Sequence, residues 1–189
     1  MSSRFGLLLL CAVVLAGCGG GQVATVSYDS ESNQSTYETK RYTVSTMSDG
    51  NYGSRQSIRM RVVAQCEGQN CTPNTAQLVF RADASKQLFL SGVNGRISAD
   101  GTEIRWSNAE ANRSFAGRNR NELVKVLGEF ATVDIGFGQL EAMASTASLE
   151  GTIGGQSLNL DADVQSGIQT LLRKMRQARS GDNSSNAGV

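Results

Sequence analysis

The feature that most constrains the fold is a series of short segments in which apolar and polar residues alternate. In the clearest of them, residues 58–64, the apolar residues Ile58, Met60, Val62 and Ala64 alternate with Arg59, Arg61 and Val63. This alternation places the apolar side chains on one face, so it predicts a half-buried β-strand. Similar segments are residues 42–44, 77–82, 87–91, 96–99, 103–107, 122–126, 130–137, 149–153 and 157–160.

Turn signals separate many of these segments. Asp-Gly, Asn-Gly and Gly-Gly pairs supply the positive φ values that tight hairpins need. They stand at residues 49–50, 94–95, 100–101 and 154–155. Short strands joined by such turns predict an antiparallel meander rather than a parallel sheet. Residues 108–121 are polar and rich in arginine, so they predict a loop, with a strand at 113–117 as the alternative.

Two segments have helical periodicity instead. Residues 138–145 predict a short helix, and a longer helix begins after Asp161, a residue suited to cap its N-terminus. Gly181 is expected to end it. Its apolar residues share one face and are Val164, Ile168, Leu171, Leu172 and Met175. The sequence therefore predicts an α+β fold: a mostly antiparallel β meander, sheet-like or sandwich-like, with one short helix and a C-terminal amphipathic helix packed on it.

The N-terminal end carries a short apolar run that follows a positive charge. Arg4 supplies the charge, and the run at residues 5–17 is too short to cross about 30 Å of hydrocarbon comfortably. The run therefore predicts the apolar region of a signal peptide. It ends in the tetrapeptide L-A-G-C at residues 15–18, with glycines at 19–21. This arrangement resembles the lipobox of bacterial lipoproteins.

The resemblance implies how the protein reaches its membrane. It implies cleavage before Cys18, a thioether-linked diacylglycerol on the sulfur of that residue, and an acyl chain on the new amino terminus. Two such chains give stable anchoring, since each buried CH2 contributes about 0.8 kcal/mol. Gly19 follows the cysteine in place of Asp, which in enteric-type bacteria favours the outer membrane, facing the periplasm or the cell surface. The alternative is an ordinary cleaved signal with an incidental cysteine.

The chain is long enough for one domain of ordinary size. We expect a signal peptide at residues 1–17, a lipidated flexible tether at 18–35, a single β-rich domain ending in a helix at 36–179, and a disordered tail at 180–189. Glycine and polar residues predict the tether, although residues 23–28 could form an edge strand. Removal of the signal peptide also removes Arg4, which leaves equal numbers of basic and acidic residues.

Cys66 and Cys71 stand close together between two predicted strands. An exported chain meets an oxidising compartment, so we expect a disulfide between them. Closing so short a loop constrains the unfolded chain by roughly 2 kcal/mol. A structural clip is our interpretation. A redox pair, which usually has two intervening residues, and two free thiols are the alternatives.

Composition excludes several kinds of chemistry. The chain has no histidine, so it holds neither a Ser-His-Asp triad nor a histidine-ligated metal. Its net charge of +1 is too small for a strongly basic nucleic-acid binder. Glu141 and Glu150 are candidates for paired catalytic carboxylates by residue type alone. We therefore expect no catalytic residue, no metal, no cofactor and no nucleic-acid partner.

A cluster of arginines is the remaining feature of chemical interest. It comprises Arg105, Arg113, Arg118 and Arg120. Grouped on one edge of a sheet, they would bind phosphates or carboxylates through bidentate hydrogen bonds. The other interpretation is a solvated edge that discourages aggregation between strands.

Two hypotheses remain for the function. The first is a lipid-anchored interaction or structural module that presents a sheet or a groove to another component of the cell envelope, such as an envelope protein. The second is a carrier or sensor that holds a small apolar ligand between the sheet and the C-terminal helix. An enclosed cavity of several hundred Å3 would favour the carrier, and a solid core would favour the interaction module.

Overall fold

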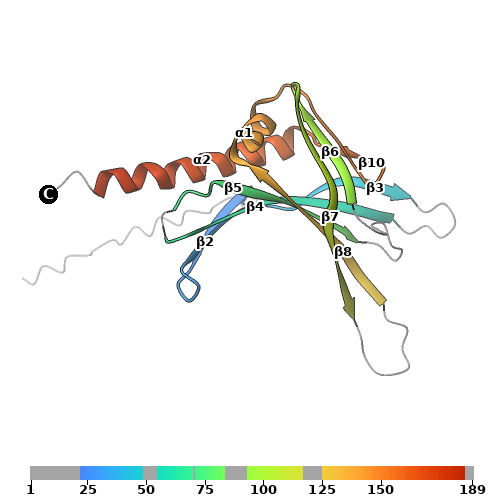
Figure 1. Cartoon of the computed structure of the whole chain (residues 1–189), viewed down its shortest axis with the longest axis horizontal. Helices are drawn as coiled ribbons and strands as arrows, with labels where there is room; N and C mark the ends of the chain where they lie inside the picture. Colours follow the sequence, from blue (N-terminus) through green and yellow to red (C-terminus); the bar gives the residue numbers. More distant parts are fainter. Residues whose placement is uncertain (1–21, 49–54, 70, 84–92, 117–124, 186–189) are drawn as a thin grey trace, which may run out of the picture.

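The computed structural model describes residues 22–48, 55–69, 71–83, 93–116 and 125–185. These residues form an antiparallel β-structure with two helices, which confirms the predicted α+β class (Figure 1). The elements are β1 (Ala24–Asp29), β2 (Gln34–Thr39), β3 (Tyr42–Ser48), β4 (Arg55–Glu67), β5 (Thr75–Asp83), β6 (Val93–Ala99), β7 (Thr102–Ala116), β8 (Lys125–Gly136), α1 (Phe137–Ser145), β9 (Leu149–Ile153), β10 (Gln156–Asn159) and α2 (Ala162–Ser185).

The strands hydrogen-bond in the order β1-β2-β4-β5-β8-β7-β6-β9-β10, with β3 pairing the first half of β4. The long strand β7 belongs to two sheets. Its first part pairs with β6, and its second part pairs with β8. Sheet A comprises β1, β2, β3, β4, β5, β8 and the second part of β7. Sheet B comprises β6, β9, β10 and the first part of β7, and the two sheets pack like a sandwich.

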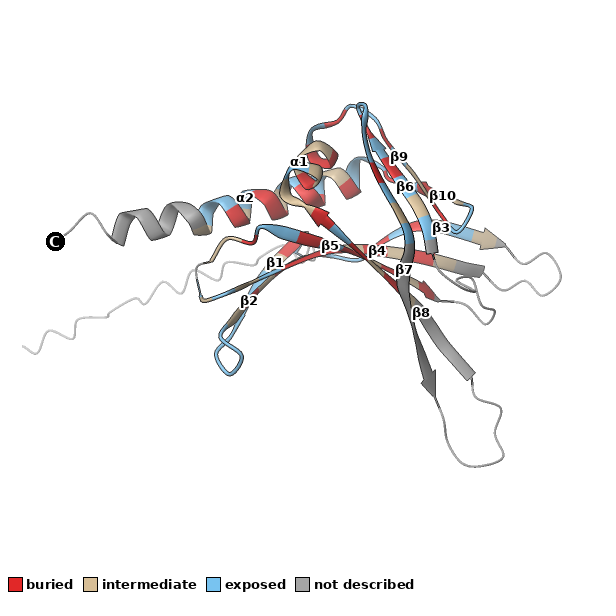
Figure 2. Cartoon of the chain, in the orientation of Figure 1, coloured by how far each residue is buried: buried red, intermediate tan, exposed pale blue. Residues whose placement is uncertain are grey.

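The alternation in sequence determines which face of each strand is buried. Ile58, Met60 and Val62 of β4 are almost fully buried, whereas Arg59 and Arg61 lie on the other face. The same period repeats in the strands on either side, so sheets A and B each turn an apolar face toward a common core (Figure 2). Phe80 of sheet A and Trp106 of sheet B stack with ring centroids 5.9 Å apart, which joins the two layers directly.

The two helices close the core on one side of the molecule (Figure 1). The Asp161 carboxylate accepts the backbone N–H groups of Asp163 and Val164 at 3.1 Å, which confirms the predicted N-cap of α2. All five apolar residues predicted on the face of α2 are at most 3% exposed. The helix packs on α1 and against β1 and β2. It extends to Ser185, past the predicted end at Gly181.

The predicted boundary between tether and domain differs from the structure. The sequence predicts a flexible tether at residues 18–35, but β1 and β2 form a hairpin that starts at Ala24 and pairs with β4. The alternative of an edge strand near residues 23–28 is therefore the correct one. The polar composition of this segment predicted a tether, but a polar residue in it, Ser35, is fully buried. Its hydroxyl donates to the carbonyls of Gly68 and Gln69 at 2.6 and 3.0 Å, so burial leaves no donor unpaired.

Two further local predictions are wrong. The Asn94-Gly95 pair lies inside β6 and makes no turn. Most of the predicted loop at 108–121 is the second part of β7, which agrees with the alternative of a strand at 113–117 as far as Ala116. The turn at Asp100-Gly101 is confirmed, since both residues have positive φ. Residues 154–155 also form the predicted turn, between β9 and β10. The predictions for Cys18, for the turn at 49–50 and for the strand at 87–91 lie outside the described residues.

Cys66, near the end of β4, and Cys71, in the connection to β5, form the expected disulfide. The sulfur atoms of Cys66 and Cys71 are 2.04 Å apart. The Tyr37 hydroxyl donates to the carbonyl of Cys71 at 2.8 Å, so β2 also holds this loop. The pair closes the connection between two neighbouring strands, as a structural clip would.

Candidate functional site

The candidate site lies on the outer face of sheet B, which is the face turned away from the core. The strand registers arrange its side chains in two rows across the sheet. The first row is Arg105, Arg96, Thr152 and Ser157, and the second is Glu103, Ser98, Glu150 and Asn159. Every one of these residues is exposed or half-buried. The face is therefore polar, accessible and built on regular strands, which hold side chains in fixed positions.

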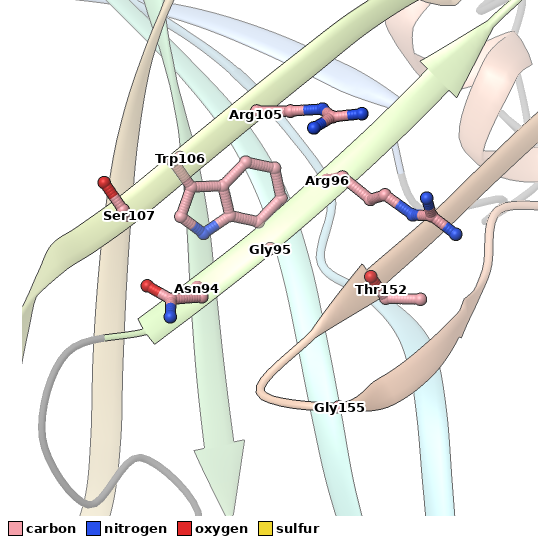
Figure 3. A pocket seen from close by; sticks show the side chains of 8 residues that line it. All are labelled: Asn94, Gly95, Arg96, Arg105, Trp106, Ser107, Thr152 and Gly155. Carbon is pink, nitrogen blue, oxygen red and sulfur yellow. The ribbon is translucent and has the colours of Figure 1, made fainter.

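One end of this face is hollowed beside Trp106, whose ring lies on the core side of sheet B and stacks on Phe80. The hollow measures about 570 Å3 and lies where β6 begins and β9 turns into β10. Its lining residues are Asn94, Gly95, Arg96, Arg105, Trp106, Ser107, Thr152 and Gly155 (Figure 3). It thus combines an aromatic ring, two guanidinium groups, an amide and hydroxyl groups within one open surface.

A second hollow of about 560 Å3 adjoins the first, and Arg96, Arg105 and Thr152 line both. Two carboxylates, Glu103 and Glu150, line the second hollow as well. The two hollows together form a continuous depression over β7, β6, β9 and β10. We call this surface the sheet B groove.

The charges of the groove are only partly balanced within the chain. Arg96 and Arg105 lie directly opposite each other on β6 and β7, and like charges in such a pair repel. Arg105 Nη2 donates to the Glu103 carboxylate at 2.7 Å, and this hydrogen bond lowers the pKa of Glu103. Within the described residues Arg96 has no ion pair. Its guanidinium is therefore available to an anionic group of a ligand.

Gly95 positions the aromatic ring of the groove. It lies opposite Trp106 in the ladder, and a β-carbon at Gly95 would overlap the indole ring. Figure 3 shows the ring lying across β6 at this glycine. The indole Nε1 is buried and has no hydrogen-bond partner among the described residues. A buried donor without a partner is unfavourable, so this nitrogen is a local cost of packing the ring against Phe80.

The structure describes two of the four arginines in the predicted cluster. Arg105 lines the groove, Arg113 lies far along β7, and Arg118 and Arg120 fall outside the described residues. Of the four arginines, Arg105 is the one that the structure places in the groove. Arg96 and Trp106 were missed as site residues, because their proximity depends on the pairing of β6 with β7. The sequence signal that could have indicated this site is a glycine inside a strand pattern, because such a glycine often marks a place where another group approaches the strand closely.

The two candidate catalytic carboxylates do not meet in any hollow of the described part of the chain. Glu141 of α1 accepts a hydrogen bond from Arg176 of α2 at 2.6 Å. Glu150 belongs to the sheet B groove. No three described acidic or cysteine residues gather as ligands of a metal ion. Neither α1 nor α2, over the residues described, combines the length and apolarity that a membrane span requires.

Comparison of the chain with protein-family models, with curated proteins and with solved structures finds no match. The site is therefore interpreted from its own geometry and chemistry.

Proposed function

We propose that this protein is a lipid-anchored interaction module of the cell envelope, and that its binding surface is the sheet B groove. The observation that carries the proposal is the pair of adjoining hollows on one polar, exposed face. The groove borders the ring of Trp106. It also offers the guanidinium of Arg96, which makes no ion pair within the described residues, to a phosphate or carboxylate. These groups suit recognition of a polar, negatively charged envelope component.

The packing of α2 favours this function over a carrier. A carrier of the kind considered above would need a cavity between the sheet and α2. The residues of α2 that face the sheet are almost completely buried, and the described hollows lie elsewhere. The hollow that involves α2 lies between α1 and α2, where Leu172 and Ala144 are flanked by the ion pair of Arg176 with Glu141.

Glu103 is unsuited to serve as the acid of a hydrolytic carboxylate pair. A pair of carboxylates that cleaves glycosidic bonds needs one acid whose pKa is raised. Glu103 has the opposite perturbation, because the hydrogen bond from Arg105 lowers its pKa. The proposal therefore assigns no catalytic residue.

The anchor would hold the domain close to the membrane. Because β1 starts at Ala24, only residues 19–23 separate Cys18 from the folded domain. At roughly 3.3–3.6 Å for each residue, this connection spans less than about 22 Å when fully extended. The distance from the headgroups to the groove would then depend on the size and orientation of the domain, because β1 and the strands of the groove lie at opposite ends of the strand order.

Formaldehyde cross-linking in cells tests the interaction. We expect a discrete complex that wild-type protein forms and Arg96→Glu loses, since the variant places a negative charge where an anionic partner docks. Arg41→Glu is the matched control, because Arg41 is also exposed but lies next to sheet A. Equal yields from both variants would contradict the proposed surface.

Two measurements separate the other parts of the proposal. Intact mass of the membrane-extracted protein should show loss of residues 1–17 and a gain of acyl mass, and Cys18→Ser should remain an uncleaved precursor. Native mass spectrometry of the same preparation should show no apolar molecule retained inside the protein. A stoichiometric apolar ligand would favour the carrier instead.

A further inference from the structure

The first strand of sheet A leaves one edge open. β1 pairs with β2 on one side, and no described strand pairs with it on the other. Natural edge strands are usually protected by lysine, proline or a bulge. β1 has the sequence ATVSYD, and its register with β2 runs without a break from Ala24 to Asp29. Its acidic residue stands at the end of the strand, so the central residues are unprotected.

This edge also carries the exposed large apolar side chains of the described chain. Val26 is 43% exposed and Tyr28 is 41% exposed. Both lie on the face of Tyr37 and Ser35, to which they are paired in β2. Single exposed apolar residues are ordinary. Two of them on one face of an unprotected edge strand instead indicate a surface that a partner covers.

The hydrogen-bonding pattern shows which peptide groups of β1 point outward. The N–H of Lys40 donates to the carbonyl of Val23 at 3.0 Å, so these two residues form a hydrogen-bonded pair. Antiparallel ladders alternate such pairs with non-hydrogen-bonded ones. Residues 23, 25, 27 and 29 therefore bond to β2. Ala24, Val26 and Tyr28 direct their N–H and C=O groups to the open edge.

We propose that β1 is the interface of a symmetric homodimer, in which two copies of the protein pair their β1 strands antiparallel about a two-fold axis at Val26. In this register Val26 lies opposite the second copy's Val26, and Ala24 lies opposite the second copy's Tyr28. These are the residues whose peptide groups point outward, so each opposed pair exchanges two hydrogen bonds. The two sheets A become one continuous sheet.

The chemistry of the strand agrees with this self-pairing on both faces. On the face of Val26, apolar residues oppose apolar residues. On the other face Thr25 opposes the second copy's Ser27, and hydroxyl pairs of this type stabilise sheets. No charged residue opposes a like charge between positions 24 and 28. The strand is therefore complementary to itself, which is the requirement for an isologous interface.

Anchoring would strengthen such a dimer. The connection from Cys18 to β1 is short, so both lipids would enter the membrane near the two-fold axis. Confinement to one membrane raises the effective concentration of the two strands without any new contact. The dimer interface is separate from the sheet B groove, and neither proposal depends on the other.

Disulfide trapping in isolated membranes tests the register. Cα atoms of a hydrogen-bonded pair are about 5.5 Å apart, within the range that a disulfide bridges. Val26→Cys should therefore give a covalent dimer upon mild oxidation. Thr25→Cys and Ser27→Cys should each give no covalent dimer, but co-expression of the two variants should give one, because these positions oppose each other. Wild type and Thr43→Cys, an exposed position on β3, are the controls.

Charged substitutions at Val26 test the same interface without oxidation. Val26→Lys and Val26→Glu each place like charges on the two-fold axis, so each extracted protein should sediment as a monomer while wild type sediments as a dimer. Mixing the two variants should restore the dimer. Circular dichroism should show native folding for both, since Val26 is partly exposed.

The outcomes decide the proposal. A dimer from Val26→Cys, with the pairing of positions 25 and 27, supports it. A monomeric wild type together with no cross-link from Val26→Cys overturns it. Equal cross-linking from Val26→Cys and Thr43→Cys also overturns it, because collisions rather than a fixed register would then form the disulfides.

Discussion

Gly167 of α2 lies directly against the phenol ring of Tyr42 in β3, and a β-carbon on Gly167 would overlap the Tyr42 hydroxyl. Both residues are buried where the helix packs on the sheet. The helix therefore approaches the sheet as closely as the absence of a side chain allows. The Tyr42 hydroxyl has no hydrogen-bond partner among the described residues, and burial raises its pKa.

We predict that Gly167→Ala destabilises the protein although alanine is the better helix former. Overpacking a core costs roughly 1–3 kcal/mol, and the gain in helix propensity offsets about 1 kcal/mol. The free energy of unfolding in urea should therefore fall by up to about 2 kcal/mol. Tyr42→Phe, which removes the hydroxyl nearest to the new methyl group, should restore much of this stability in the double variant. An additive double-mutant cycle would contradict the contact.

The apolar face of α2 should be indispensable for folding. Leu171→Asp buries a charge in place of a fully buried leucine, so it should lose more than about 4 kcal/mol and unfold the domain. Ser166→Asp introduces the same residue at an exposed position of the same helix and should melt within a few degrees of wild type. Similar melting temperatures for the two variants would show that α2 lies outside the core.

The fluorescence of Trp106 should report on the groove, since no other tryptophan contributes. Gly95→Ala places a methyl group into the indole ring, so the ring should move toward solvent and its emission should shift to longer wavelength. Gly138→Ala is the matched control, because a β-carbon there meets nothing within 4 Å. An unchanged spectrum for Gly95→Ala would contradict the placement of the ring.

Asp100 should contribute stability that is lost in acid. Its carboxylate accepts the N–H of Ala147 at 2.9 Å, and this hydrogen bond, with a further one from Thr146, lowers the pKa of Asp100. Because the pKa is lower in the folded than in the unfolded chain, Asp100 contributes its full stabilisation at pH values above the unfolded pKa of about 3.9. That stability is lost as the pH falls through the folded value.

Asp100→Asn tests this dependence, because asparagine also tolerates the positive φ at this position. Urea unfolding between pH 5 and pH 2.5, a range that brackets the unfolded pKa of about 3.9, should show a steeper loss for wild type than for the variant. NMR titration of the Asp100 carboxyl carbon gives the pKa directly. A value at or above that of an unfolded chain would contradict the prediction.

The sequence predicted those parts of the fold in which burial and periodicity coincide. Residues 58–64 and the apolar face of α2 are examples, because one buried face leaves a regular pattern of side chains. The second part of β7 has no such alternation. Its pairing with β8 is a property of the backbone, which side-chain patterns do not record. Ser35 illustrates another limit, since satisfied hydrogen bonds allow a polar residue to be buried.

The candidate site was predicted only in part for a related reason. Arg105 stood out within a local cluster of arginines, but the residue that lies opposite it is Arg96 of another strand. The Asn94-Gly95 pair had the composition of a turn. In the structure the same glycine makes room for the ring of Trp106. Sequence spacing does not distinguish these two uses of glycine, because the second depends on a contact between strands.

The central claim is that an envelope partner docks on the sheet B groove, and site-specific photo-cross-linking in cells tests it most directly. A photoreactive residue would replace Ser98, which is exposed in the groove, or Thr43, which is exposed on β3 of sheet A. We predict a discrete adduct from position 98 that Arg96→Glu abolishes, and none from position 43. Adducts of equal yield at both positions, or none at position 98 in intact cells, would contradict the account.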